Sequence, residues 1–216
     1  MRRFPELPIY TGFNTPSRVE ADVNDLMIDG EVPKDLDGFY YSARPDPQYP
    51  PKLGTDIYFN GDGMISRFHI KNGRVDFKCR YARTEKWNAE NEAGRALFGA
   101  YRNPFTDDEI VMGKSRSTAN TNAFYHAGKL FAMKEDSPPT WMDPYTMETI
   151  DASYTFGGKL QSQTFTAHPK YDFENGEMIA INYGATGVAT DDVSLVVVDA
   201  KGEIAHEVFF KVPYAN

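Results

Sequence analysis

The residues of this chain that could do chemistry are foremost its four histidines, which are His69, His126, His168 and His206. They lie 57, 42 and 38 residues apart, so no pair has the HxH or HExxH spacing that puts two metal ligands on one element. His168 has the most unusual setting, in TAHPK, because Pro169 holds the residue before it extended and suits a strand terminus or edge. An imidazole on such a stem could be a ligand, although a hydrogen-bonded structural histidine is the commoner role. For the other three we expect structural roles, on a strand face or beside a hairpin turn.

Two further stretches could carry charge chemistry. Lys134, Glu135 and Asp136 directly follow the apolar run KLFAM and precede a proline pair. They are either charges at a solvated strand exit or groups held beside the lining of a site. The GDG in FNGDGMI, residues 59–65, lacks both the lysine of a phosphate-binding loop and the carboxylate spacing of an EF-hand. We therefore predict a hairpin turn there.

Composition limits the classes of protein that this chain can represent. Its 216 residues are 41% hydrophobic and 14% aromatic, enough for a real core. The net charge of −8, with no block of Lys or Arg, excludes a nucleic-acid backbone as partner. The single cysteine, Cys79, excludes an intramolecular disulfide and a thiolate zinc site, fits a reducing compartment, and is expected to be a small buried hydrophobe. With no apolar run long enough for a signal peptide or a membrane span, we expect a cytoplasmic protein.

The elements that must position these groups are predicted to be antiparallel strands. Runs rich in β-branched and aromatic residues flank turn signals at Lys71-Asn72-Gly73, Ala127-Gly128 and Lys201-Gly202, where Gly supplies the positive φ of a tight hairpin. The one helical stretch predicted is WNAENEAGRALFGA, residues 87–100, with an acidic first half. Repeated hairpins with so little helix indicate an all-β sandwich, barrel or propeller, and periodicity does not choose between them.

Five separated blocks of the sequence resemble the carotenoid cleavage oxygenase family, and within it the lignostilbene dioxygenase-like branch. They are GEVPKDLDGFYY, FNGDGMISRFHI, AYRNPFTDD, STANTNAFYHAGKLFAMKEDSPPTW and SQTFTAHPKYD, and they occur in the family's order. The resemblance covers nearly all of the chain. It implies an all-β, seven-bladed β-propeller that holds one non-haem Fe(II) on its axis with four histidines and uses O₂ as co-substrate.

The resemblance also implies roles for individual residues near the metal. His168 matches the first of the four iron ligands. Glu135 matches the carboxylate that accepts the N–H of another ligand histidine and so fixes that ring. Thr121 resembles the threonine whose methyl group limits access to the sixth position of the iron. Four neutral imidazoles leave the charge of the metal uncompensated and leave positions open for O₂, which suits oxygen activation.

A second group of matched residues implies the substrate. Tyr101 and Lys134 resemble the pair that grips the 4-hydroxyl group in lignostilbene-type members, and Phe59 resembles an aromatic residue that packs on the substrate ring. A lysine near a phenol favours phenolate, which pushes electron density across the conjugated alkene. Members that cleave hydrocarbon polyenes need no such pair. The resemblance thus predicts cleavage of the central double bond of 4-hydroxystilbenes to two aromatic aldehydes.

Family members are more than twice as long as this chain, so residues 1–216 are expected to be the N-terminal portion, about three blades, of a single propeller domain. The other three ligands would then follow Asn216, and the fragment alone would be inactive. Two alternatives stay open. One is an apocarotenoid-cleaving oxygenase with a polyene substrate, and the other is a non-catalytic propeller remnant or binding module. The sequence does not specify an oligomeric state.

Overall fold

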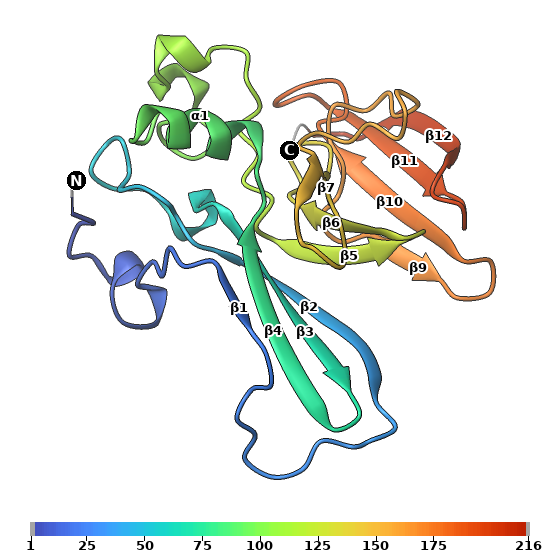
Figure 1. Cartoon of the computed structure of the whole chain (residues 1–216). Helices are drawn as coiled ribbons and strands as arrows, with labels where there is room; N and C mark the ends of the chain where they lie inside the picture. Colours follow the sequence, from blue (N-terminus) through green and yellow to red (C-terminus); the bar gives the residue numbers. More distant parts are fainter. Residues whose placement is uncertain (1–2, 215–216) are drawn as a thin grey trace.

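The computed structural model describes residues 3–214, which form three four-stranded antiparallel sheets (Figure 1). The first sheet has the order β1-β4-β3-β2, with β1 (Ala21–Val23), β2 (Asp37–Pro45), β3 (Gly63–Lys71) and β4 (Arg74–Tyr81). The second has the order β5-β6-β7-β8, with β5 (Asn122–His126), β6 (Lys129–Met133), β7 (Thr140–Met142) and β8 (Thr149–Asp151). The third has the order β12-β11-β10-β9, with β9 (Lys170–Asp172), β10 (Glu177–Tyr183), β11 (Asp192–Val198) and β12 (Ile204–Lys211).

Helical structure is sparse and lies mainly to one side of the sheets, as Figure 1 shows for α1 (Glu85–Ala93). The other helical elements in the described residues are short 3₁₀ turns: η1 (Pro8–Tyr10), η2 (Gly12–Asn14), η3 (Tyr58–Asn60), η4 (Pro104–Thr106) and η5 (Glu109–Val111). Among residues 3–214, none of these helices has the length and apolar character needed to cross a membrane.

The predicted hairpins are confirmed. Asn72 and Gly73 join β3 to β4 with φ values of 53° and 78°, and Ala127 and Gly128 join β5 to β6 with φ values of 47° and 80°. Two successive positive φ angles characterise the turn whose twist matches that of the flanking strands. Gly202, with φ of 82°, lies in the turn between β11 and β12. Each hairpin keeps neighbouring strands in one sheet, so the sheets follow one another along the chain as blades of a propeller do.

The predicted helix over 87–100 is wrong at both ends. The helix begins after Thr84, whose side chain accepts a hydrogen bond from the Trp87 amide, and it ends at Gly94, which has φ of 67°. These are an ordinary N-cap and a left-handed C-cap. The chain then folds back, and the amides of Leu97 and Phe98 donate to the Glu90 carboxylate. The apolar patch that looked like helix is therefore a buried return segment.

The predicted hairpin turn at GDG is also wrong. Residues 58–60 form η3, and Gly63 opens β3. A Cβ atom on Gly63 would lie 2.2 Å from the carbonyl oxygen of Ala119, so glycine is required here by close approach of a second backbone segment. Asp62, the residue before Gly63, is buried. The motif joins the first sheet to the segment that leads into β5.

The core lies between neighbouring sheets. One buried cluster joins the first and second sheets and includes Ile65, Leu130 and Met142. The other joins the second and third sheets and includes Phe131, Phe165, Met178 and Val196. Cys79 is buried in a third, smaller cluster against Met64 and Tyr81, as expected for a structural thiol. Sheets that pack face to face in sequence order are the arrangement of consecutive propeller blades.

A buried ion cluster fixes α1 to the first sheet. The Lys86 ammonium lies 2.8 Å from an oxygen of Asp62 and 2.8 Å from an oxygen of Glu90, and all three side chains are nearly inaccessible to solvent. Burial would lower the pKa of Lys86, but the two carboxylates outweigh it and raise the pKa, so the group stays charged. The free oxygens of the carboxylates are used as well, because Asp62 accepts from the Gln48 amide.

We predict that Lys86→Met destabilises the protein by about 3–5 kcal/mol, because it leaves two buried carboxylates without their counter-ion. Chemical unfolding followed by circular dichroism measures the change. Lys159→Met is the matched control, since Lys159 pairs with Glu203 at the exposed surface and its loss should be scarcely measurable. Equal effects of the two substitutions would contradict the importance given to the buried cluster.

Candidate functional site

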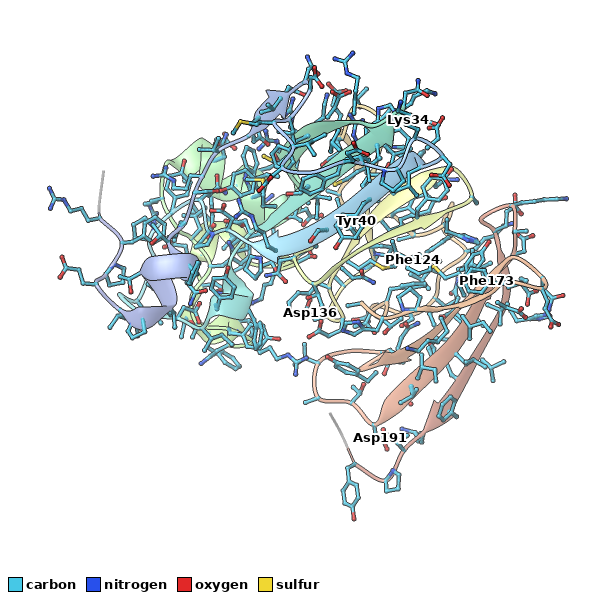
Figure 2. All side chains as sticks on the ribbon, turned by 90° about the horizontal axis from the view of Figure 1, so that it is seen from below. Lys34, Tyr40, Phe124, Asp136, Phe173 and Asp191 are labelled. Carbon is cyan, nitrogen blue, oxygen red and sulfur yellow. The ribbon has the colours of Figure 1, made fainter. Side chains whose placement is uncertain are left out.

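A cavity of about 500 Å³ lies where residues 99–118 meet the ends of β6 and β10. Its lining includes Tyr101, Arg102, Lys134, Asp136 and Tyr183. Figure 2 shows Asp136 near the middle of the molecule, between the ribbons of the first and third sheets. The cavity therefore gathers ionisable side chains from three separate parts of the chain, which is the kind of setting in which binding sites form.

Lys134 is the most buried charge in this cavity, with 3% of its side chain exposed. Its ammonium lies 3.3 Å from the Tyr101 hydroxyl and 3.3 Å from an oxygen of Glu135. Burial favours the neutral amine, but the negative charges of Asp136 and Glu135 outweigh it and raise the pKa of Lys134. The sequence left two interpretations of Lys134, Glu135 and Asp136 open. Because Lys134 is buried, the interpretation as a charge at a solvated strand exit is wrong for this residue.

The two acidic residues beside Lys134 differ in their environments. Burial opposes ionisation of Glu135, yet its backbone hydrogen bond and the Lys134 charge hold its pKa below the usual range. Burial raises the pKa of Asp136. Within the described residues, Asp136 Oδ1 is buried without a hydrogen-bond partner, and so are Thr118 Oγ1 and Ser137 Oγ, which line the same cavity. Unpaired polar atoms in a cavity are free to bind a polar ligand or water.

Arg102 and Tyr183 belong to the site although the sequence analysis missed them. Arg102 Nη2 donates a hydrogen bond of 2.6 Å to the Tyr183 hydroxyl and lies 4.0 Å from an oxygen of Glu135. The guanidinium carbon is 5.5 Å from the centre of the Tyr101 ring. Arg102 stands next to Tyr101 in the AYRNP block, which is a signal that could have found it. Tyr183 has no local signal, because its partner lies 81 residues away.

Phe59 and Thr121 lie apart from this cavity lining, at exposed positions, but one asparagine connects them. Asn120 Nδ2 donates to the carbonyl of Phe59 at 2.8 Å, and the Thr121 hydroxyl donates to Asn120 Oδ1 at 3.1 Å. The same amide also binds the carbonyl of Gly61. Asn120 itself is buried. The NTN motif therefore fixes the backbone around both predicted residues.

His168 is exposed just before β9, and the backbone around it is tightly held. Its amide donates to the Thr166 hydroxyl at 3.1 Å, and the Thr166 amide donates to Asn182 Oδ1 at 2.7 Å. From the NTN motif, Asn122 Nδ2 donates to the carbonyl of Ala167 at 2.9 Å. No partner holds the imidazole itself among residues 3–214. The backbone at this position is therefore fixed, and the ring is accessible to solvent.

The other histidines do not join His168. His126 is buried and its Nε2 lies 2.7 Å from the carbonyl oxygen of Asp199. His69 stacks on Phe39, with ring centres 4.6 Å apart, and His206 lies exposed on β12. Over residues 3–214, no group of three or more His, Cys, Asp or Glu side chains could hold a metal ion. The described residues could therefore supply an iron site with one imidazole, that of His168.

Comparisons with known proteins identify the family of this chain. The family model described as RPE65, retinal pigment epithelial membrane protein, matches residues 13–216. The chain is 50% identical to the lignostilbene-α,β-dioxygenase isozyme III of Sphingomonas paucimobilis, over 99% of the chain and 44% of that protein. It is 48% identical to the resveratrol cleavage oxygenase 1 of Aspergillus fumigatus, over 97% of the chain and 42% of that protein.

A solved structure of a lignostilbene dioxygenase is similar to this chain in three dimensions as well. The chain superimposes on the crystal structure of the Pseudomonas brassicacearum lignostilbene dioxygenase with a TM-score of 0.96 and 46% identity, covering 100% of the chain and 45% of that structure. The chain thus spans less than half the length of the relatives that it matches, and its three sheets are blades of a β-propeller. The family model matches residues 13–216, and the fold agrees with this solved structure. The chain therefore belongs to the RPE65 family, the carotenoid cleavage oxygenases.

Proposed function

We propose that this chain forms the N-terminal part of an Fe(II)- and O₂-dependent oxygenase that cleaves the central double bond of 4-hydroxystilbenes. The observation that carries the proposal is the buried Lys134 ammonium in contact with the Tyr101 hydroxyl at a cavity of about 500 Å³. The names of the lignostilbene and resveratrol relatives support the same substrate class. In the reaction, each alkene carbon takes one atom of O₂, one C=C bond breaks, and two aromatic aldehydes form.

The role of Lys134 and Tyr101 follows from their charge and position. A phenol placed against the pair accepts a hydrogen bond from the Lys134 ammonium and can donate to or accept from the Tyr101 hydroxyl, and the ammonium stabilises the ionised form of the phenol. The oxygen electron pair of a phenolate is conjugated with the alkene at the para position, so the alkene becomes richer in electrons. The pair therefore both orients the substrate and prepares it for attack by oxygen.

Iron, when bound, would supply the activation of O₂. In our proposal, His168 gives one imidazole to that site and the three remaining donors come from outside the described residues. Glu135 would accept the N–H of another ligand histidine, Thr121 would stand beside the open position, and Phe59 would pack on the substrate ring. Their support is the family motif together with the asparagine network that fixes the backbone of Phe59 and Thr121.

The alternatives differ in how they use the cavity. An apocarotenoid chain offers no hydroxyl group to Lys134 and Tyr101 at the middle of a polyene, so the buried pair would stay without a function. A non-catalytic remnant or binding module would leave the pair as a simple phenol-binding site. Assays of a full-length protein with stilbenes and an apocarotenal separate these three cases. A cytoplasmic location stays a prediction.

Lys134→Met in a full-length enzyme carrying this segment should lower turnover of 4-hydroxystilbenes by about 10²–10⁴-fold, the usual contribution of a positioned acid–base group. Steady-state kinetics measures the loss, and thermal unfolding confirms that the variant is folded. Lys114→Met is the control, because Lys114 also lines the cavity but is exposed. Wild-type turnover in the Lys134 variant would remove the main support for a phenolic substrate.

His168→Ala in the same full-length enzyme should abolish iron binding and activity together, while the metal-free variant melts close to the temperature of the metal-free wild type. The physical reason is that the exposed imidazole has no partner among residues 3–214, whereas the backbone is held by Thr166 and Asn182; surface substitutions of this kind are nearly neutral for stability. Metal analysis and calorimetry on one sample test both statements. Full iron occupancy with a depressed melting temperature would make His168 a structural residue.

The 216-residue chain by itself should hold Fe(II) only weakly and cleave no stilbene, because one imidazole competes poorly with water for a ferrous ion. Equilibrium dialysis with Fe(II) under anaerobic conditions measures the affinity. The chain carrying His168→Ala serves as the reference for non-specific binding. Tight, stoichiometric iron in the wild-type chain would contradict the proposal and would direct attention to His126 and His206.

A further inference from the structure

Three asparagine–glycine pairs occur in this chain, at residues 60–61, 72–73 and 175–176. The backbone nitrogen of the glycine in such a pair can attack the side-chain carbonyl carbon of the asparagine, and glycine has no side chain to obstruct the approach. The reaction requires an asparagine side chain that can rotate and a glycine N–H that can lose its proton. Hydrogen bonds to these groups hold the pair in an unreactive form until the structure opens locally.

The pair at residues 60–61 is held at both of its reacting groups. Asn60 Nδ2 donates to the carbonyl of Gly99 at 3.1 Å and also to the carboxylate of Asp56. The Gly61 amide donates to the carbonyl of Tyr58 at 3.1 Å. The side chain therefore cannot turn, and the attacking nitrogen is not free.

The pair at residues 175–176 is also held at both groups, although Asn175 is exposed. Asn175 Nδ2 donates to an oxygen of Asp172 at 2.9 Å. The Gly176 amide donates to the backbone carbonyl of Asp172 at 2.8 Å. Exposure alone thus does not release this pair from its hydrogen bonds.

The pair at residues 72–73, in the turn between β3 and β4, is different. Neither the side-chain amide of Asn72, which is exposed, nor the N–H of Gly73 has a hydrogen-bond partner among residues 3–214. Both residues line an open cavity of about 570 Å³, together with Ile28 and residues 30–34. Even a Cβ atom added to Gly73 would lie 3.5 Å from its nearest neighbour, the carbonyl oxygen of Val32. The side chain of Asn72 therefore has room to turn, and water has access to the pair.

We propose that Asn72 is a site of spontaneous deamidation. The nitrogen of Gly73 forms a bond to Asn72 Cγ, its proton passes to the departing amino group, and ammonia leaves a succinimide ring. Water then adds to one of the two ring carbonyls and opens the ring. Breaking the bond between the nitrogen and Cγ gives Asp, whereas breaking the bond between the nitrogen and the backbone carbonyl carbon gives isoaspartate.

The two products affect the hairpin differently. Both add a carboxylate at a tip where Lys71 and Arg74 are already paired with Asp37 and Asp25, each at 3.0 Å. Asp leaves the backbone unchanged and tolerates the left-handed φ of 53° found at Asn72. Isoaspartate places an additional carbon atom in the main chain of a two-residue turn. Because Lys71 and Arg74 lie directly opposite each other, this product should loosen the end of the hairpin.

Ageing of a folded full-length protein that carries this segment, at slightly alkaline pH, tests the inference. Proteolysis and mass spectrometry measure the loss of asparagine at each pair. Asn72 should react about tenfold or more faster than Asn60 and Asn175, because those two pairs must first open locally. Its product should separate into two chromatographic peaks of equal mass, Asp and isoaspartate. Asn72→Gln should lose this signal, because its longer side chain must close a larger ring.

The same protein unfolded in urea is the matched reference. Unfolding removes the hydrogen bonds of all three pairs, so the three rates should converge there. Equal rates in the folded protein would overturn the inference, because the hydrogen bonds would then give no protection. Reaction of Asn72 in urea but not in the folded protein would also overturn it, because the turn itself would then hold Asn72 unreactive. Neither measurement depends on stilbene cleavage, so the inference and the proposed function stand or fall separately.

Discussion

The buried contact between Lys86, Asp62 and Glu90 is the constraint on which the functional region depends. It joins the start of β3 to α1. The second oxygen of Glu90 receives the amides of Leu97 and Phe98, so it also determines where the chain goes after the helix. That return segment leads to Tyr101. A charge that is removed from water must be fully paired, and here the pairing fixes the direction of the backbone.

The second buried lysine, Lys134, differs from Lys86 in how many of the polar groups around it have hydrogen-bond partners. The carboxylates around Lys86 have their other oxygens occupied by amides, and the contacts to Lys86 are 2.8 Å long. Around Lys134 the contacts are 3.3 Å long, and within the described residues Asp136 Oδ1 has no partner. The first cluster is saturated and contributes rigidity. The second retains unused hydrogen-bonding capacity beside a cavity, which is the physical difference between a structural ion cluster and a binding site.

Asparagine side chains supply the connection between the sheets and the predicted site residues. Asn120 binds the carbonyls of Phe59 and Gly61, Asn122 binds the carbonyl of Ala167, and Asn182 accepts from Thr166 and donates to Ser194. Each of these amides satisfies backbone groups of irregular segments that lie against a sheet. Residues 58–63, 119–122 and 165–168 are thereby held in a fixed relation, although they come from different parts of the chain.

The sequence by itself determined the strands, the hairpin turns and the family motifs, because those depend on local patterns of β-branched residues, glycines and short blocks such as TAHPK. It could not determine the path of residues 95–100 after the helix, since the Glu90 carboxylate fixes that path by accepting hydrogen bonds from two amides further along the chain. It could not determine that GDG enters a strand, because the glycine is required by the distant carbonyl of Ala119. Nor could it show that Lys134 is buried or that Arg102 meets Tyr183. Those facts depend on contacts between residues far apart in sequence, which only the packed tertiary structure decides.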